Sequence, residues 1–117
     1  MSQTNQQWQT RREAAVAQGV GNALPVYIAR ARNAELWDVE GKRYIDFASG
    51  IAVLNTGHNH PAVIDAVKAQ LEHFTHPCFQ VTPYGNYIEL AERLNALVPI
   101  EDACQTLFLS TGAEAVE

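Results

Sequence analysis

The sequence predicts a chain of the α/β class, and three observations support that class. Two runs of alternating apolar and polar residues flank a turn at Glu40-Gly41, two amphipathic helical segments follow, and the apolar run 105–110 then breaks into helix-forming residues. Only the last unit, a strand that enters a helix, is typical of the opening of an α/β sheet. A single strand of this kind cannot bury both of its faces, so we expect the 117 residues to be a piece of a larger fold.

The first part of the chain predicts a short helix, a strand and a β-hairpin. The helix is expected over 10–17, and the strand over 24–28 with Pro25 near its start. The hairpin consists of residues 35–39 and 42–47, because two period-two runs around a glycine-containing turn are its usual signal. We expect Trp37 and Tyr44 to pair across its strands.

Two helices and a final strand-to-helix unit follow. Pro61 opens the first helix, where its missing N–H is not needed, and the apolar residues of one face are Val63, Val67, Leu71 and Phe74. The second helix is predicted from Tyr84 to Leu97, ahead of Pro99, and its apolar stripe is Tyr87, Leu90, Leu94 and Leu97. The final strand is expected over 105–110.

Composition and charge narrow the class of protein. Hydrophobic residues make up 47% of the chain and charged residues 18%, which is enough apolar material for a core. The net charge of −5 without a basic patch excludes nucleic acid as a natural partner. The apolar runs are too short to span a bilayer, and Cys78 and Cys104 form no disulfide framework. We therefore expect a cytoplasmic protein without a membrane partner.

The turn at residues 110–113 is the sharpest candidate for a binding site. The first amides of a helix have no partner inside it, and the helix dipole adds positive charge there, so such a turn can hold an anion. Gly112 lets an anion approach the backbone, the amides of Ala113 and Glu114 would face it, and Thr111 could add its hydroxyl. An ordinary strand-to-helix turn capped by Ser or Thr has the same pattern and is the commoner interpretation.

The histidines His58, His60, His73 and His76 lie within nineteen residues, and Cys78 follows. Their spacing argues against a metal ion, because the predicted helix separates the two pairs by roughly 20 Å at ~1.5 Å rise per residue. We expect Asn59 or His60 to cap the start of this helix, and the later pair to lie at its end, where an imidazole is favourable.

The remaining reactive side chains have structural interpretations. The close carboxylates Asp38 and Glu40 could suggest acid–base chemistry, but on a hairpin we expect them to face water and help to set the turn. Cys78 lacks a defined base that would make it a nucleophile. Lys42 in the hairpin turn and Lys68 on a polar helix face lack the buried setting that would lower a lysine pKa for covalent chemistry.

Two separated motifs carry a resemblance to a known family. Residues 37–61, WDVEGKRYIDFASGIAVLNTGHNHP, resemble the amino-terminal part of class III (ω-type) aminotransferases that use pyridoxal 5'-phosphate, most closely the bacterial 4-aminobutyrate type. Residues 111–117, TGAEAVE, resemble the phosphate-loop segment of the same family, in the right order and at the right distance. Two motifs in register are far more specific than either one alone.

The resemblance implies a subunit of fold type I, with active sites at the interface of a homodimer or a dimer of dimers. Residues 1–60 would form the amino-terminal segment of the small domain, and residues 61–117 the connecting helices and the start of the large, cofactor-binding domain. The phosphate contacts fall on Gly112 and Ala113, with Thr111 beside them. Ile51 matches a position that lines the substrate pocket, and Gln80 matches a position near its mouth.

The implied reaction moves the amino group of 4-aminobutyrate to 2-oxoglutarate, giving succinic semialdehyde and glutamate, so the implied partners are small amine and 2-oxo acid substrates. The lysine that carries the cofactor lies further along the chain in relatives, so the 117 residues alone are expected to be inactive. Two alternatives stay open. One is an acetylornithine or ornithine aminotransferase of the same family, and the other is a non-catalytic domain that only associates with an intact subunit.

Overall fold

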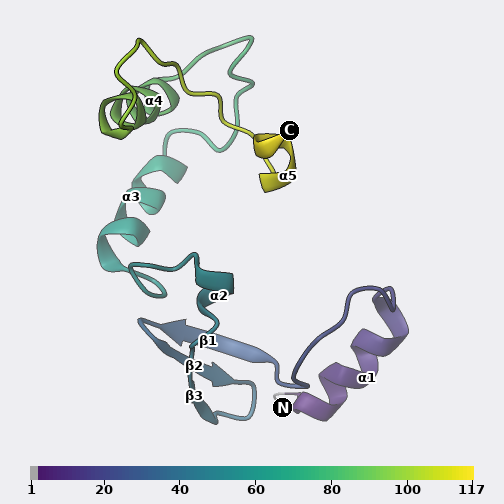
Figure 1. Ribbon diagram of the computed structural model, residues 1–117. Helices are drawn as coiled ribbons and strands as arrows, with labels where there is room; N and C mark the ends of the chain where they lie inside the picture. Colours follow the sequence, from purple (N-terminus) through teal and green to yellow (C-terminus); the bar gives the residue numbers. More distant parts are fainter. Residues whose placement is uncertain (1–2) are drawn as a thin grey trace. The chain divides into compact units, whose positions relative to one another are not determined.

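The computed structural model describes residues 3–117 and consists of two compact units, Met1–Glu72 and His73–Glu117 (Figure 1). The first unit contains, in order, α1 (Asn5–Ala15), β1 (Ile28–Arg32), β2 (Glu35–Asp38), β3 (Arg43–Ile45), α2 (Ser49–Ala52) and α3 (Pro61–Leu71). The second unit contains α4 (Gly85–Leu97) and α5 (Gly112–Val116). The division into domains 1–60 and 61–117 stays a prediction.

The expected hairpin is present as β2 and β3 of an antiparallel sheet with the order β1-β2-β3. Gly41 has φ +85°, a left-handed conformation that glycine adopts without a steric penalty, and it closes the turn. The predicted pairing of Trp37 with Tyr44 is wrong, because Tyr44 lies opposite Leu36 in this register. The Trp37 ring instead packs against the Arg30 guanidinium of β1, 3.6 Å from the ring centroid.

The first helix and the first strand both differ from the expected positions. The helix begins five residues early, at Asn5, because Thr4 and Gln7 form a reciprocal capping box. The strand expected over 24–28 forms later, as β1, because its register is set by pairing with β2 through Arg32 and Glu35. Pro25, which has no N–H to donate to a ladder, lies before the strand.

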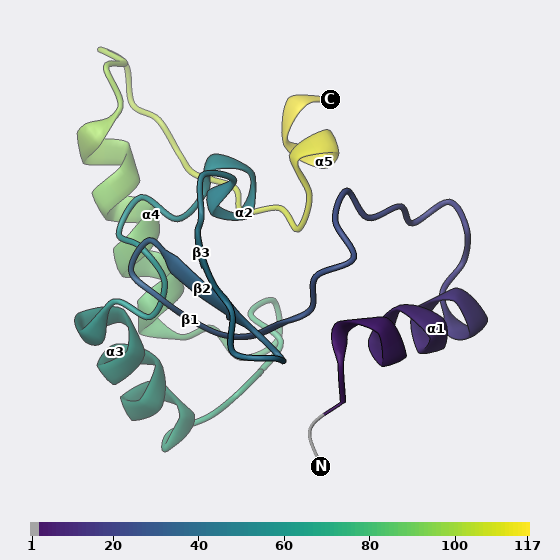
Figure 2. The same ribbon diagram turned by 90° about the horizontal axis from the view of Figure 1, so that it is seen from below.

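Polar contacts join α1 to the turn of the hairpin within the first unit, where α1 lies to one side of the sheet (Figures 1 and 2). The Asn5 amide nitrogen donates to Asp38 Oδ2 at 3.0 Å and to Glu40 Oε2 at 2.6 Å. Its side-chain oxygen accepts from the Tyr27 N–H at 2.8 Å. One side chain thus links the helix, the hairpin turn and the segment before β1.

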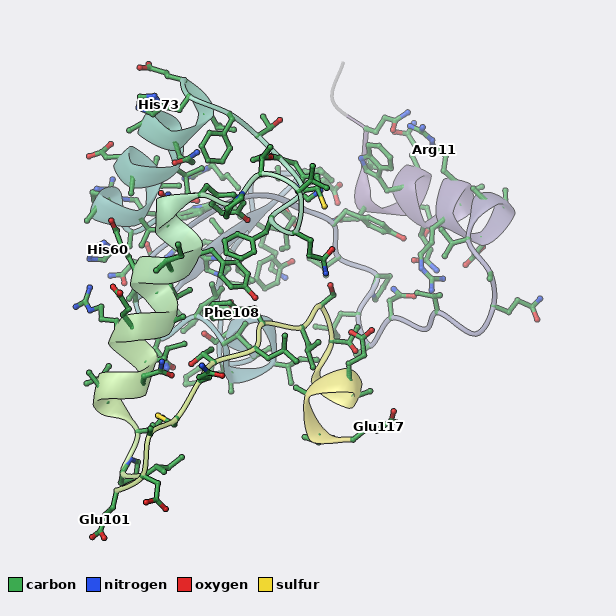
Figure 3. The ribbon with its side chains drawn as sticks, turned by 90° about the horizontal axis from the view of Figure 1, so that it is seen from above. Arg11, His60, His73, Glu101, Phe108 and Glu117 are labelled. Atoms are coloured by element: carbon green, nitrogen blue, oxygen red, sulfur yellow. The ribbon has the colours of Figure 1, made fainter. Side chains whose placement is uncertain are left out.

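The second unit is organised by aromatic side chains around α4. Tyr87 stacks on Phe79 with centroids 4.0 Å apart and meets Phe108 edge-on at 4.6 Å, and the Phe108 side chain lies beside α4 in Figure 3. The strand expected over 105–110 does not form. Its polar groups bond to helix side chains instead, since Thr106 donates to Asn95 Oδ1 at 2.7 Å and the Phe108 N–H donates to the Tyr87 hydroxyl at 3.4 Å.

No apolar side chain within residues 3–117 is buried. Helices α3 and α4 begin and end close to their predicted positions, at Pro61 and Leu71 and at Gly85 and Leu97. The apolar face predicted for α3 is nevertheless exposed, because Val63, Val67 and Leu71 are each more than half exposed. None of the helices in this described range combines the length and the hydrophobicity needed to cross a bilayer.

We expect Gly57→Ala to destabilise the first unit more than Gly41→Ala. Both glycines have positive φ, so either change costs about 1–2 kcal/mol. At Gly57 the new Cβ would also lie 2.7 Å from Asn33 Oδ1 and 3.0 Å from Asn33 Cα, whereas at Gly41 it meets no atom within 4 Å. The clash should add about 1 kcal/mol or more. Urea unfolding followed through the fluorescence of Trp8 and Trp37 measures the free energy of unfolding of both variants. Equal decreases in this free energy would contradict the structure.

Candidate functional site

The turn before α5 forms a complete capping box. Thr111 is the N-cap residue, and its hydroxyl oxygen accepts from the Glu114 N–H at 3.2 Å. The Glu114 carboxylate in turn accepts from the Thr111 N–H at 3.1 Å and from the Thr111 hydroxyl at 3.0 Å. In this arrangement the Glu114 amide and the Thr111 hydroxyl satisfy each other, and the expected contact of Thr111 with an anion stays a prediction.

Two amides remain available at this turn. The N–H groups of Gly112 and Ala113 donate to no acceptor within the described range 3–117. A Cβ placed on Gly112 would meet no atom within 4 Å, so the position that a side chain would occupy at this residue is open. The pair therefore fits an anionic group that accepts from two successive backbone amides.

Ile51 lies in a turn of unusual handedness. Four successive residues, 49–52, have positive φ between 47° and 66°, so α2 is a short left-handed turn. Left-handed backbone costs about 1–2 kcal/mol for each L-residue, and Ser49, Ile51 and Ala52 all bear this cost. A β-branched residue such as Ile51 rarely adopts it. The Ile51 side chain is 90% exposed, so the turn presents it outward from the first unit.

Asp46 organises the start of this turn. Its Oδ1 atom accepts from the Ala48 N–H at 3.1 Å and from the Ser49 N–H at 2.8 Å, and its Oδ2 atom lies 2.7 Å from His58 Nε2. The pKa of Asp46 is lowered, mainly by the hydrogen bond from His58 and next by the one from the Ser49 amide. Together they outweigh partial burial, which acts to raise this pKa. Because Asp46 is ionised, it accepts, and His58 Nε2 carries the proton.

Sequence reasoning did not select Asp46 as a site residue. One local feature could have indicated its role. Asp46 directly follows a strand and precedes the small residues Ala48-Ser49-Gly50, and Asp side chains often accept from amides two residues further on. Its second partner is twelve residues away in the sequence, and no periodicity connects the two positions.

Gln80 belongs to the second unit and is exposed, beside Cys78, whose Sγ lies 3.9 Å from Gln80 Oε1. Thr111, Gly112 and Ala113 also belong to the second unit. The predicted site residues are thus divided, with Ile51 on the first unit and the cofactor candidates on the second. Both cysteines are free thiols.

The histidines lie in separate settings. His58 pairs with Asp46, while His60 stands at the N-cap of α3 without a side-chain hydrogen bond to the helix, and Asn59 donates to the Ala31 carbonyl at 2.8 Å. The expected capping by Asn59 or His60 is therefore wrong. His73 follows the end of α3 (Figure 3). No group of three or more His, Cys, Asp or Glu side chains able to hold a metal ion occurs among residues 3–117.

Asp38 sets the hairpin turn, as expected, but it does not face water. Only 4% of it is exposed. Its Oδ1 accepts from the amides of Glu40 and Lys42 at 3.0 and 2.8 Å, and its Oδ2 accepts from the Tyr44 hydroxyl at 3.0 Å. Burial acts to raise the pKa of Asp38, but the hydrogen bonds from Asn5, Lys42, Tyr44 and Glu40 together lower it.

The two lysines are exposed, as the sequence predicted. Lys42 Nζ lies over the Tyr44 ring, 5.1 Å from its centroid, in the hairpin turn. Lys68 lies in the last turn of α3. Neither side chain has the desolvated setting that covalent carbonyl chemistry requires.

Comparison with known proteins identifies the family. The model of the family described as Aminotransferase class-III matches residues 15–117. The chain belongs to this family. Class III aminotransferases are pyridoxal-phosphate-dependent enzymes, which agrees with the resemblance of both sequence motifs.

Curated relatives and solved structures support the same assignment. The chain is 56% identical over its whole length to the 5-aminovalerate aminotransferase of Pseudomonas aeruginosa, and 52% identical over 97% of its length to the 4-aminobutyrate aminotransferase of Escherichia coli. It spans 28% and 27% of those relatives. The acetylornithine aminotransferase of Elizabethkingia anophelis is similar over 97% of this chain and 28% of its own, with a TM-score of 0.86 and 27% identity. The predicted α/β class, as part of a fold type I enzyme, is confirmed.

The pairing of Asp46 with His58 predicts a pH dependence for the turn at 46–58. The pKa of folded Asp46 lies below the value of 3.8 for an unpaired aspartate, so its contribution to stability is fully present above that value and is lost as the pH falls through the folded pKa. Amide exchange at Ala48 and Ser49, corrected for intrinsic rates, should accelerate over that range. His58→Ala should move the NMR titration midpoint of Asp46 upward; an unchanged midpoint would contradict the assignment.

Proposed function

We propose that this chain forms part of an aminotransferase that removes the terminal amino group of an unbranched ω-amino acid, with 4-aminobutyrate as the donor and 2-oxoglutarate as the acceptor. The products are succinic semialdehyde and glutamate. The observation that carries the proposal is the 47–56% identity to proteins named 4-aminobutyrate and 5-aminovalerate aminotransferases, over 97–100% of this chain. Acetylornithine aminotransferases, an alternative within the family, are represented by structures at 27% and 30% identity.

The amides of Gly112 and Ala113 would hold the phosphate of pyridoxal 5'-phosphate. Two N–H groups without an acceptor, one of them on a glycine that has open space at its Cβ position, suit a phosphate oxygen, and each bond to a charged group is worth about 1.5–3 kcal/mol. When bound, the cofactor supplies an electron sink for the bond-breaking steps at the amine-bearing carbon. Ala113 offers its amide but no hydroxyl, and Thr111 contributes its own hydroxyl only if Glu114 releases it.

Ile51 would line the pocket for the methylene chain of the donor, with Gln80 near the mouth. An exposed, apolar side chain held outward by a rigid turn can cover methylene groups without offering a partner to a charge. 4-Aminobutyrate and 5-aminovalerate differ by one methylene, which a hydrophobic pocket distinguishes by only about 10–200-fold. Ornithine brings an additional ammonium group, and an apolar surface provides no compensation for its desolvation.

Several expectations accompany this proposal as predictions. They are the assembly into a homodimer or a dimer of dimers, the cytoplasmic location, and the assignment of residues 1–60 and 61–117 to the small and large domains. The second candidate is a non-catalytic domain that associates with an intact subunit. The exposed apolar side chains of both units favour it, because they provide a surface for docking.

The full-length product of the gene that encodes this chain should use 4-aminobutyrate with 2-oxoglutarate. Its kcat/KM for ornithine should be at least about 100-fold lower, because the pocket does not compensate the second ammonium. Glutamate formation measured with each donor tests the expectation. A preference for ornithine or acetylornithine would replace the substrate assignment, and inactivity with every donor would favour the association domain.

Gly112→Pro should weaken binding of pyridoxal 5'-phosphate to the full-length product by about 10–100-fold, since one charge-assisted hydrogen bond is lost. Proline is tolerated at the first helical position, and Thr111 already has the extended backbone that precedes proline. Ala113→Ser is the matched control, because it keeps the amide and should bind at least as tightly. Equilibrium dialysis with absorbance detection measures both; equal affinities for the Gly112→Pro variant and the wild type would count against the phosphate site.

A further inference from the structure

The segment between β3 and α3 combines a strained turn with a single polar pair that spans it. The left-handed residues 49–52 lie near its start, and the segment closes at Gly57 and His58. Left-handed backbone is unfavourable for Ser49, Ile51 and Ala52, so this conformation persists only where the surrounding contacts determine it. The hydrogen bonds at the entrance of the turn converge on Asp46.

The carboxylate of Asp46 acts on the entrance of the turn. Its Oδ1 atom holds the Ala48 and Ser49 amides at 3.1 and 2.8 Å. The Ala48 carbonyl then accepts from the Ile51 and Ala52 amides at 2.7 and 2.9 Å. The backbone of Ile51 is thus two hydrogen bonds away from Asp46, through the Ala48 peptide.

The imidazole of His58 holds the other oxygen of Asp46 and is itself fixed. The His58 side chain is 22% exposed and that of Asp46 is 8% exposed, with 2.7 Å between Nε2 and Oδ2. The His58 backbone exchanges two hydrogen bonds with Asn33, at 2.8 and 2.9 Å, in the link between β1 and β2. The pair therefore joins the start of the segment to its end and both to the sheet.

We propose that Asp46 and His58 are positioning residues that set where the Ile51 side chain lies, and through it the fit of the donor substrate. The inference rests on the proposed function, because it takes Ile51 as part of the substrate pocket. Neither Asp46 nor His58 contacts substrate in this role. Asp46 holds the left-handed turn in place, and His58 keeps the Asp46 carboxylate oriented through the 2.7 Å contact between Nε2 and Oδ2.

The first test measures the turn without reference to activity. Peptide-level hydrogen exchange over residues 47–57 of the full-length gene product should accelerate more than tenfold in Asp46→Ala, and less in Asp46→Asn, which keeps one acceptor oxygen. His58→Gln, which keeps an N–H donor, should exchange more slowly than His58→Ala. Asp65→Ala is the matched control on α3 and should leave the segment unchanged. Unaltered exchange in Asp46→Ala would overturn the proposal.

The second test asks whether the effect passes through Ile51. Asp46→Asn should raise the KM for 4-aminobutyrate severalfold or more, with a smaller change in kcat, and Ile51→Ala should do the same. In the double variant the two increases in KM should not multiply, because the turn can no longer act through a side chain that Ile51→Ala has removed. Effects that multiply fully would overturn the positioning role, even if the turn loosens.

The two tests separate this inference from the proposed function. If Ile51→Ala leaves the kinetics with 4-aminobutyrate unchanged while Asp46→Ala still loosens the turn, the pocket role of Ile51 fails and the structural role of the pair stands. If the wild-type product uses 4-aminobutyrate but the turn is insensitive to Asp46, the proposed function stands and the present inference fails.

Discussion

Hydrogen bonds to two aspartates organise the turns that follow β2 and β3 of the first unit, and no apolar side chain in the described part of the chain is buried. Asp38 and Asp46 stand at the end of β2 and just after β3, and they work in the same way. One oxygen of each carboxylate accepts two amides of the following turn, and the other reaches a side chain from a different element. A carboxylate has about four acceptor positions, so it can satisfy a turn and a distant donor together. The pKa of each group is lowered accordingly.

The same arrangement connects the fold to the proposed chemistry. Hydrogen bonds at the Asp38 end join α1 to the turn of the hairpin. Hydrogen bonds at the Asp46 end extend that order into a segment that presents Ile51. The second unit supplies a different element, a short helix whose first two amides are free of partners within residues 3–117 while its third is capped by Thr111. In the proposed function, the first unit would contribute Ile51 to the substrate pocket, and the second unit would contribute Gln80 and the phosphate-binding amides of Gly112 and Ala113.

Sequence patterns predicted the elements that depend on neighbours along the chain. The hairpin, α3 and α4 were predicted because alternation, helical periodicity and the Gly41 and Pro61 signals are local. The expected strand at 105–110 was wrong because a strand requires a partner strand, and here Asn95 and Tyr87 satisfy its polar groups instead. The start of α1 was missed although Thr4 and Gln7 have capping-box spacing. The left-handed turn at Ile51 had no local signal, because only Gly50 among its residues favours that backbone and the stabilising partner of Asp46 is twelve residues away.

The handedness of the turn at Ile51 also bears on protein engineering. A substrate pocket is usually widened by trimming the side chains that form its wall. In the proposed pocket, the backbone beneath the Ile51 side chain is held in an unfavourable conformation, so changing that conformation is a second route. Exchanging Ala52 for glycine removes a steric penalty and so stabilises the present turn, whereas removing the Asp46 acceptor should loosen it, and neither change alters the Ile51 side chain. A library that varies the residues supporting the turn would therefore sample different orientations of one unchanged side chain, which substitution of Ile51 alone does not reach.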